Sequence, residues 1–242
     1  MNYGLQLYSV RDAASENYEN TLKAVADMGY EFVESAGFFE YSADQIKQWL
    51  DKYNLKLSST HSSFRELKQD FDAAVKFHKI IGDTKFIIPC MDCKTKESLD
   101  YYVELFNKYE PMLKEHGIDL GFHNHAAEFL KNQDGIIPME YLLEKTNIKF
   151  EIDVYWAYVA NRCPLEVLEQ FKSRHIGYIH LKDGLKFPEA QGKSLGLGSA
   201  PVRDVIAKAK DMGLQMIVES EDLNPTGLQE VARCAEFLKA NG

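Results

Sequence analysis

The sequence contains few cysteines, no long apolar run and no excess of positive charge. Its 242 residues include only four cysteines, too few for the disulfide framework that stabilises small secreted folds. No segment approaches the roughly 18 consecutive apolar residues of a membrane-spanning helix. The first residues, MNYGLQLYSVRD, lack the basic segment and apolar stretch of a secretory signal. We therefore expect a cytoplasmic protein that does not enter a membrane.

The charge balance argues against one class of partner. Lysine and arginine number 28 against 37 aspartates and glutamates, which gives a net charge of -9. Because an acidic surface repels phosphate backbones at long range, we expect no nucleic-acid partner and a small-molecule substrate. Hydrophobic residues make up 45% of the chain, enough to exclude disorder. The oligomeric state stays open, a homo-oligomer included.

Short apolar runs alternate with longer amphipathic segments along the entire chain. The runs predict strands at 3–10, 32–36, 55–60, 85–90, 118–123, 149–153, 176–181 and 215–219. The segments between them predict helices at 17–28, 43–53, 64–81, 96–116, 139–146, 164–173, 201–212 and 227–238. Glycine or asparagine, which accept the left-handed conformation that ends a helix, follows several of these helices, in ADMGYEFV, KYNLKLS, KIIGDTKFII, KEHGIDLGF and KDMGLQMIV.

Eight apolar strands joined by crossover helices indicate a parallel sheet, and eight repeated units favour closure into a barrel. The alternative is an open doubly wound sheet. That fold usually has a glycine-rich phosphate turn after its first strand, and here the turn reads SVRDAASEN. The predicted fold is therefore α/β, a single (βα)8 TIM barrel in one domain over residues 1–242.

Polar residues concentrate where the predicted strands end, which is the active-site face of a (βα) barrel. They are His61, His123, His125, Glu128, Asp153, Trp156, His180, Lys182, Asp183, Glu219 and Glu221. Side chains alternate along a strand, so residues two apart, such as His180 and Lys182, can both face the barrel mouth. Four of the seven histidines lie at these ends.

One residue from each of four consecutive strands forms a candidate metal site. His123, Asp153, His180 and Glu219 are spaced by about one βα unit each, so the four strands would deliver them to a common point. Imidazole and carboxylate ligands suit a divalent ion such as Mn, Co, Zn, Fe or Mg, and the sequence does not select among them.

A single histidine or aspartate at a strand end is more often a hydrogen-bonded terminus than a ligand. Four such residues on adjacent strands, however, favour a shared metal site over four separate hydrogen-bonded termini. Without a cation, Asp153 and Glu219 would repel each other in a medium of low dielectric constant, a cost that a divalent ion removes.

Three further signals are weaker. The CxxC spacing at 90–93 has no second pair, so we assign it no function. The segment GKSLGLGSAP, residues 192–201, contains GxG and either cradles an anion at the next helix or forms a loop without a ligand. Aromatic residues in predicted loops either wall a sugar or belong to the core; they are Tyr8, Phe38, Trp156 and Phe187.

Several motifs together resemble the sugar phosphate isomerase/epimerase family of xylose isomerase-like TIM barrels. They are GLQLYSVR, VESAGF, HNHAAEF, EIDVYW, HLKD, SLGLGS and VESED, and they cover essentially the whole chain in the family's order. The resemblance implies a divalent metal held by residues of strands 5 to 8, usually Glu, Asp, His and Glu.

Carried over residue by residue, the resemblance makes Asp153, His180 and Glu219 the ligands from strands 6 to 8. Strand 5 departs from the pattern, because His123 stands where many epimerases of the family have glutamate. His123 is the first choice for the fourth ligand, with His125 and Glu128 as alternatives. The departure matters because the glutamates of strands 5 and 8 are the acid/base pair proposed for two-sided proton exchange in the epimerases.

The resulting hypothesis is a metal-dependent isomerase or epimerase of a keto sugar or related polyol, acting through an enediolate. Glu219 is the candidate base, His125 or Glu128 returns the proton on the other face, and Lys182 stabilises the enediolate oxygen. Further contacts to sugar hydroxyls are assigned to His61, Glu34, Trp156 and Glu221.

Three other functions share the same barrel. A lyase or dehydratase of a keto sugar or keto-inositol would expel an oxygen from the same enediolate, and it gains ground from the missing strand 5 glutamate. An endonuclease for abasic DNA needs more metal ligands and a basic face, against which the charge of -9 argues. A sugar-binding barrel without catalysis would bind sugar equally well in the presence of a chelator.

Overall fold

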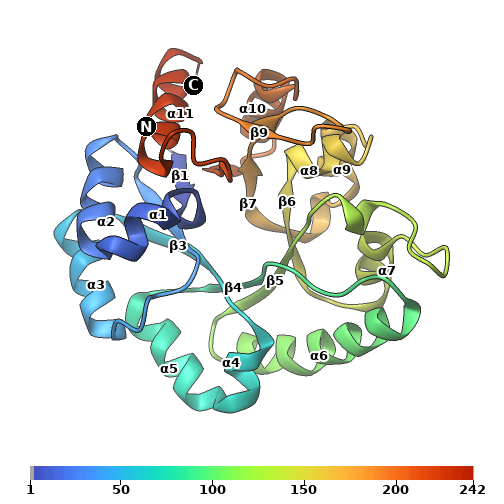
Figure 1. The fold of residues 1–242 in the computed structure, drawn as a ribbon. Helices are drawn as coiled ribbons and strands as arrows, with labels where there is room; N and C mark the ends of the chain where they lie inside the picture. Colours follow the sequence, from blue (N-terminus) through green and yellow to red (C-terminus); the bar gives the residue numbers. More distant parts are fainter. Residues whose placement is uncertain (1–2, 242) are drawn as a thin grey trace.

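The computed structural model describes residues 3–241 and contains one closed barrel of eight parallel strands surrounded by helices (Figure 1). Around the barrel the strands follow the order β1-β10-β7-β6-β5-β4-β3-β2, and the pairing of β1 with β10 closes it. The strands are β1 (Tyr3–Gln6), β2 (Phe32–Ser35), β3 (Lys56–His61), β4 (Lys85–Ile88), β5 (Asp119–His123), β6 (Lys149–Asp153), β7 (His175–Leu181) and β10 (Gln215–Val218). This confirms the predicted (βα)8 barrel.

Helices cover the outside of the barrel, as Figure 1 shows. The α-helices are α1 (Arg11–Glu16), α2 (Tyr18–Asp27), α3 (Ala43–Lys52), α4 (Phe64–Gln69), α5 (Phe71–Ile81), α6 (Lys96–Glu115), α7 (Pro138–Lys145), α8 (Val154–Val159), α9 (Pro164–Gln170), α10 (Val202–Asp211) and α11 (Gly227–Asn241). Short 3-10 helices are η1 (Leu7–Val10), η2 (Ala127–Phe129) and η3 (Lys172–Arg174). The predicted helix-ending glycines and asparagine, 29, 54, 82, 117 and 213, all have positive φ. No helix of residues 3–241 is long and apolar enough to cross a membrane.

Two predicted elements are shorter than the sequence pattern indicated, each because a side chain caps a turn. The first strand ends at Gln6, whose side chain accepts a hydrogen bond from the Tyr8 backbone N–H at 2.9 Å and begins η1. The helix predicted over 64–81 is broken at Asp70, which has an extended backbone and accepts from the Ala73 N–H at 3.0 Å. Both are local capping bonds that compete with the periodic pattern.

The barrel interior away from the polar strand ends is apolar and tightly filled. Phe32, Ile87, Ile176, Tyr178 and Ile217 form one buried cluster there. Two strand glycines make room for it: a Cβ on residue 4 would lie 2.2 Å from the ring of Phe32, and one on residue 121 would lie 2.6 Å from Ile87. This apolar layer closes the barrel below, so polar groups in the upper half lie in a medium of low dielectric constant.

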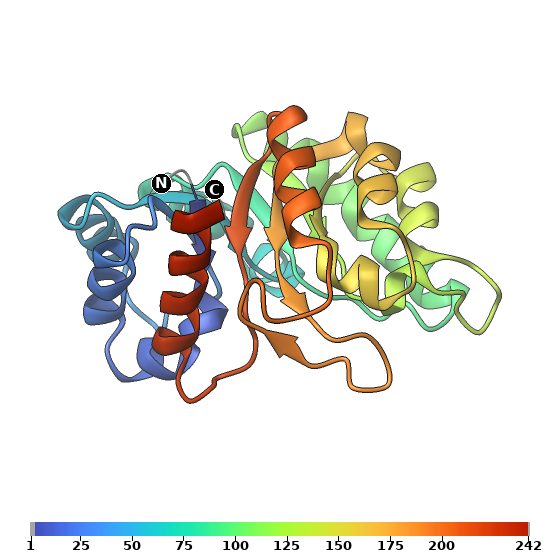
Figure 2. The same cartoon turned by 90° about the horizontal axis from the view of Figure 1, so that it is seen from above.

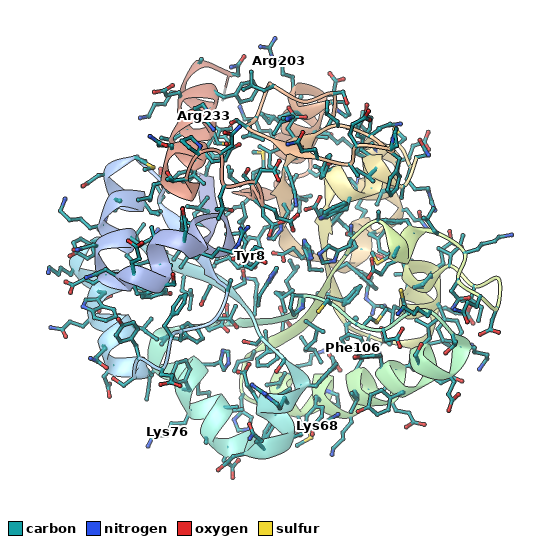
Figure 3. All side chains as sticks on the ribbon, in the orientation of Figure 1. Tyr8, Lys68, Lys76, Phe106, Arg203 and Arg233 are labelled. Carbon is teal, nitrogen blue, oxygen red and sulfur yellow. The ribbon has the colours of Figure 1, made fainter. Side chains whose placement is uncertain are left out.

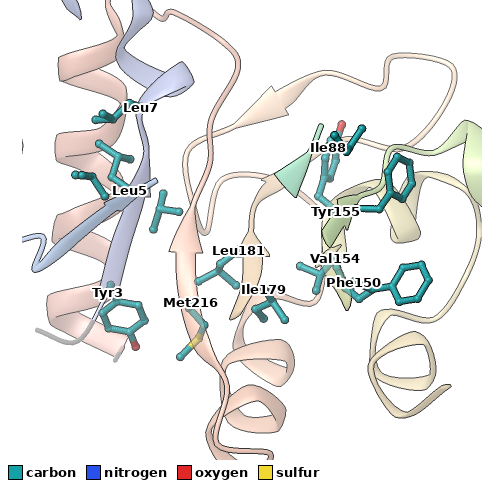
Figure 4. Packing of buried hydrophobic residues seen from close by; sticks show 14 of the residues in the cluster. Tyr3, Leu5, Leu7, Ile88, Phe150, Val154, Tyr155, Ile179, Leu181 and Met216 are labelled. Atoms are coloured by element: carbon teal, nitrogen blue, oxygen red, sulfur yellow. The ribbon is translucent and has the colours of Figure 1, made fainter. Parts of the chain in front are cut away.

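The opposite faces of the strands pack against the helices. Alternation along β7 places Ile179 and Leu181 in this outer layer, and Figure 4 shows them beside Met216 of the neighbouring strand β10. The same alternation turns Tyr178 and His180 inward. The strands that carry the polar residues at their ends are therefore buried on both faces.

The segment after β7 is held by one buried carboxylate. A hairpin of β8 (Asp183–Gly184) and β9 (Gly192–Lys193) lies at the arrowhead side of the barrel strands (Figure 2). The Asp183 carboxylate accepts backbone N–H bonds at 2.8–3.1 Å from residues 184, 196, 198 and 200. The glycine-rich segment 192–201 therefore binds the Asp183 side chain. The sequence had suggested either a site for an external anion or a loop without a ligand, and the structure shows neither.

A second buried network joins β3 to helices α4 and α5. Asp83 accepts from His78 Nδ1 at 2.7 Å and from the Thr60 hydroxyl at 2.8 Å, and His78 Nε2 lies 3.5 Å from a Glu66 carboxylate oxygen. Burial alone would lower the pKa of His78, but the bonds to Asp83 and Glu66 outweigh it and raise the pKa to about 9. His78 is therefore charged at neutral pH and ties α5 to the barrel.

This network predicts a pH-dependent contribution to stability. A histidine pKa raised from 6.5 to about 9 stabilises the folded state fully below pH 6.5, by up to about 3 kcal/mol, and the contribution is lost as the pH rises through 9. We expect the difference in unfolding free energy between the wild type and His78→Gln to shrink over this range in urea titrations. A difference that stays constant between pH 6 and pH 10 would contradict the assignment.

Candidate metal centre

Four side chains from the carboxyl ends of neighbouring strands converge at the barrel mouth. His123 ends β5, Asp153 ends β6, His180 lies in β7 and Glu219 follows β10. Each offers a donor atom, and these four atoms all lie within 4.8 Å of one another. All four side chains are buried. The strand register accounts for part of this convergence, because Asp153 pairs directly with His180.

The donor atoms are spaced for a shared ion and lack hydrogen bonds to one another. His123 Nε2 lies 3.7 Å from Asp153 Oδ2, and His180 Nδ1 lies 3.4 Å from Glu219 Oε2. Within residues 3–241, both ring nitrogens of His123, Asp153 Oδ2 and His180 Nδ1 have no hydrogen-bond partner. Donors around a tetrahedral ion with bonds of about 2.1 Å are separated by about 3.4 Å. Buried polar atoms without partners are rare, so these residues fit a divalent ion.

Asp153 is held so that one of its two oxygens stays available. Its Oδ1 accepts the Trp156 backbone N–H at 2.8 Å and caps α8. The side chain of Asn124 makes two hydrogen bonds to the backbone of Asp153. Its Oδ1 accepts from the Asp153 N–H at 3.1 Å, and its Nδ2 donates to the Asp153 carbonyl at 3.2 Å. The sequence patterns revealed neither α8 nor the role of Asn124. Together they direct Oδ2 toward the other donors.

The protonation states of His123, Asp153 and Glu219 suit metal ligation. Burial, followed by the nearby charges of His180 and His61, lowers the pKa of His123 far below its usual value, so its imidazole is neutral. Burial raises the pKa of Asp153 to about 6 against the opposing charge of Lys182. Burial would also raise the pKa of Glu219, but Lys182 and His180 outweigh it and hold the pKa well below normal. At neutral pH both carboxylates are ionised. Burial would lower the pKa of His180, but Glu151, Glu34 and Glu219 outweigh it and raise the pKa well above normal, so an ion would have to displace the proton on Nδ1.

Lys182 supplies one positive charge beside the cluster. Its Nζ lies 2.8 Å from Glu221 Oε2, 3.5 Å from Glu219 Oε2 and 4.6 Å from the centre of the Trp156 ring. The carboxylates of Asp153, Glu219 and Glu221 bring three negative charges and Lys182 one positive charge, so two negative charges are left over once His180 has released a proton to bind as a neutral imidazole. A divalent ion would neutralise this remainder.

A cavity of about 500 Å³ opens above the cluster. The residues that the sequence singled out and that line it are Tyr8, His61, His123, His125, Glu219 and Glu221. Figure 3 shows Tyr8 near the barrel axis, whereas Lys76 and Arg203 lie at the periphery. Its volume is sufficient for a small-molecule ligand.

Four of the residues expected to act on substrate do not line the cavity: Glu34, Glu128, Lys182 and Trp156. Glu34 is fully buried below the cluster. Glu128 is also buried, and its Oε2 accepts the His125 backbone N–H at 2.9 Å, which makes it a turn cap. Burial raises the pKa of Glu128. His125 lies nearer, with its ring centre 5.0 Å from that of His123.

Glu151 is a further buried group near the site, and the sequence analysis missed it. It lies two residues before Asp153 on β6, so both side chains face the barrel interior, and this period-2 spacing was the available signal. Burial and the charge of Glu34 raise the pKa of Glu151 to about 7. Burial would raise the pKa of Glu34 too, but His61 and His180 outweigh it and keep the pKa below normal.

Comparison with known proteins agrees with the architecture. The family model of the xylose isomerase-like TIM barrel matches residues 22–240. A sugar phosphate isomerase/epimerase from Parabacteroides distasonis superposes with a TM-score of 0.83 at 25% identity, covering 98% of this chain and 93% of that protein. The IolI protein, crystallised with a bound zinc atom, has a TM-score of 0.75 at 11% identity and covers 99% and 97% of the two chains.

The curated relatives point to one named reaction. Inosose dehydratase from Mesomycoplasma hyopneumoniae strain 7448 is 25% identical over 192 residues, which cover 69% of this chain. The match spans only 62% of the length of that relative.

The geometry predicts which strand 5 residue holds the ion. We expect the purified protein to bind a divalent ion and His123→Ala to weaken binding of Zn²⁺ at least about tenfold, because a donor is lost from the cluster. Glu128→Gln is the matched control and should bind Zn²⁺ like the wild type. Competition with a chelating dye measures both. Equal affinity of His123→Ala and the wild type would rule out this ligand set.

Proposed function

The chain belongs to the xylose isomerase-like TIM barrel family, and on that premise we propose that it is a divalent-metal-dependent isomerase or epimerase of a keto sugar or related polyol. The observation that carries the proposal is the convergence of donor atoms of His123, Asp153, His180 and Glu219 beside the cavity, where those of the first three residues have no hydrogen-bond partner within residues 3–241. The IolI structure, which shares the fold and contains a zinc atom, supports a metal ion in a barrel of this kind.

His123, Asp153, His180 and Glu219 would hold the ion, and when bound it would acidify the C–H beside a ketone. Glu219 lines the cavity and is held ionised by Lys182 and His180, which suits a group that accepts a proton from carbon. A proton held on this carboxylate stays within the buried mouth and can return to the same carbon or to a neighbouring one.

Lys182 is placed to stabilise the negative charge that develops on the enediolate oxygen. Its ammonium group is fixed between Glu219 and Glu221, both of which line the cavity, and rests on the Trp156 ring. Neighbouring carboxylates outweigh the effect of burial and raise the pKa of Lys182, so it stays charged. A preorganised charge in a buried site is worth several kcal/mol to a developing oxyanion.

Proton return on the other face is better served by His125 than by Glu128. His125 lines the cavity, whereas the Glu128 carboxylate is used by the His125 N–H. Burial and the neighbouring His123 lower the pKa of His125 to about 4, so its ring is neutral at pH 7 and would have to take up a proton from solvent before it returns one to the substrate.

His61 and Glu221 line the cavity, and we assign them to contacts with sugar hydroxyls. Trp156 does not line the cavity; its ring packs against Lys182. Glu34 has no access to the cavity, so we do not assign it to the substrate.

A second candidate function is elimination by a dehydratase or lyase acting on a keto sugar or keto-inositol. It is favoured by the neutral imidazole of His123, since no second ionised carboxylate faces Glu219 from strand 5. The similarity to inosose dehydratase supports the same outcome.

Incubation of keto sugars and keto-inositols with the metal-loaded protein in deuterated water separates the two outcomes. Isomerisation or epimerisation exchanges a C–H for C–D and retains every hydroxyl in the NMR spectrum. Elimination yields an enone. A sugar that binds without exchange or elimination, and binds equally in the presence of chelator, would contradict both and leave a sugar-binding barrel.

The role of Lys182 predicts a specific kinetic pattern. Lys182→Met keeps the length of the side chain but removes the charge, so we expect kcat to fall about 10²- to 10³-fold while KM changes little. Zn²⁺ content should not fall, because Lys182 competes with the ion for Glu219. A loss of bound metal that accounts for the lost activity would argue against direct stabilisation by Lys182.

A further inference from the structure

A second cluster of potential ligands lies directly below the first and shares one residue with it. Glu34, His61, Glu151 and His180 offer donor atoms within 4.8 Å of one another. Their closest separations are 2.6 Å between His180 Nε2 and Glu34 Oε2 and 2.9 Å between His61 Nε2 and Glu151 Oε2. Two donors on one ion are separated by about 3 Å or more, so these are hydrogen bonds. The lower cluster is a hydrogen-bonded network.

Glu34 is the centre of this network and accepts from three directions. Ser59 Oγ donates to its Oε1 at 2.5 Å, and Gln6 Nε2 donates to its Oε2 at 2.6 Å. Both partners and Glu34 itself are fully buried. Because the Glu34 carboxylate only accepts, the bond from His180 Nε2 requires a proton on that nitrogen.

A proton on Nε2 fixes what the other side of the His180 ring can do. Nδ1 is then the ring nitrogen that can give up its proton and offer a lone pair to an ion, and it lies 3.4 Å from Glu219 Oε2 with no hydrogen-bond partner in the described chain. We propose that Glu34 is a positioning residue that sets the tautomer and the orientation of His180, so that Nδ1 faces the metal. The inference rests on the metal centre of the proposed function and gives Glu34 a role in place of sugar contact.

His61 and Glu151 close the network on the side of the cavity. The His61 ring stacks on His180 with centres 5.4 Å apart and planes inclined by 24°, and His61 itself lines the cavity. Its Nε2 lies 2.9 Å from Glu151 and 3.3 Å from Glu34. This ring separates the Glu34–His180 bond from the cavity and limits rotation of His180. Groups that orient a ligating histidine in this way typically contribute 10- to 100-fold to metal affinity.

The test compares metal affinity in variants of this layer. Glu34→Gln places an amide NH₂ among three donors and removes the charge, so we expect Zn²⁺ affinity to fall 10- to 100-fold in competition with a chelating dye. The visible spectrum of the Co²⁺ form should shift, because the ligand field of a reoriented imidazole differs. Ser59→Ala keeps the His180 contact and should lose less than threefold.

Tyr178→Phe is the control for general loosening of the barrel. Tyr178 lies on β7 two residues before His180 and donates to the Ser58 carbonyl, so loss of its hydroxyl destabilises the same strand without removing a hydrogen bond to Glu34. We expect it to lower the unfolding temperature with unchanged Zn²⁺ affinity and an unchanged Co²⁺ spectrum. Glu34→Gln with wild-type affinity and spectrum would overturn the proposal.

A measurement on the wild-type protein covers the case in which Glu34→Gln does not fold. In ¹⁵N-histidine protein loaded with ¹¹³Cd²⁺, the His180 signals, identified by their loss in His180→Gln, should show metal coupling at Nδ1 and a proton on Nε2. Coupling at Nε2, or no bound cadmium at His180, would overturn the proposal. None of these readouts uses a substrate, so normal metal binding without turnover of any keto sugar would sink the proposed reaction and leave the role of Glu34 intact.

Discussion

Negative charge buried at the carboxyl ends of the strands is the constraint on which this structure depends. Asp153 and Glu219 lie side by side in a medium of low dielectric constant, where like charges repel strongly. Lys182 neutralises part of this charge and leaves room for a divalent ion to neutralise the rest. The apolar layer around Phe32 closes the barrel below and keeps the dielectric constant low. A cation bound among these carboxylates would relieve the cost of that burial.

Hydrogen bonds within the fold fix the direction in which Asp153 and His180 present a donor atom. Asp153 uses one oxygen as a helix cap and has the other left over. His180 uses one ring nitrogen in the bond to Glu34 and has the other left over. In both residues a hydrogen bond on one side fixes the donor atom on the other, which lowers the entropy lost when an ion binds.

The sequence predicted the barrel and the converging strands well, because alternation of apolar runs and helix-ending glycines is a local signal repeated eight times. It could not reveal the role of Asn124, which depends on contacts with Asp153 on another strand. The only sequence signal for Glu151 was its spacing of two residues from Asp153. Glu34 shows the same limit as Asn124: its place at a strand end indicated a polar role, but only the three-dimensional packing shows that it faces His180 rather than the cavity. At Gln6 and Asp70 the reason is different, because local capping bonds to residues two and three positions further on overrode the periodicity.

The central claim is a divalent ion shared by His123, Asp153, His180 and Glu219. Anomalous diffraction from crystals grown with Mn²⁺ or Zn²⁺ tests it most directly, because the signal locates the ion without reference to any reaction. The account predicts a strong anomalous peak about 2.0–2.3 Å from donor atoms of all four residues. A peak at other residues, or no peak in crystals whose loading is verified by fluorescence, would contradict it.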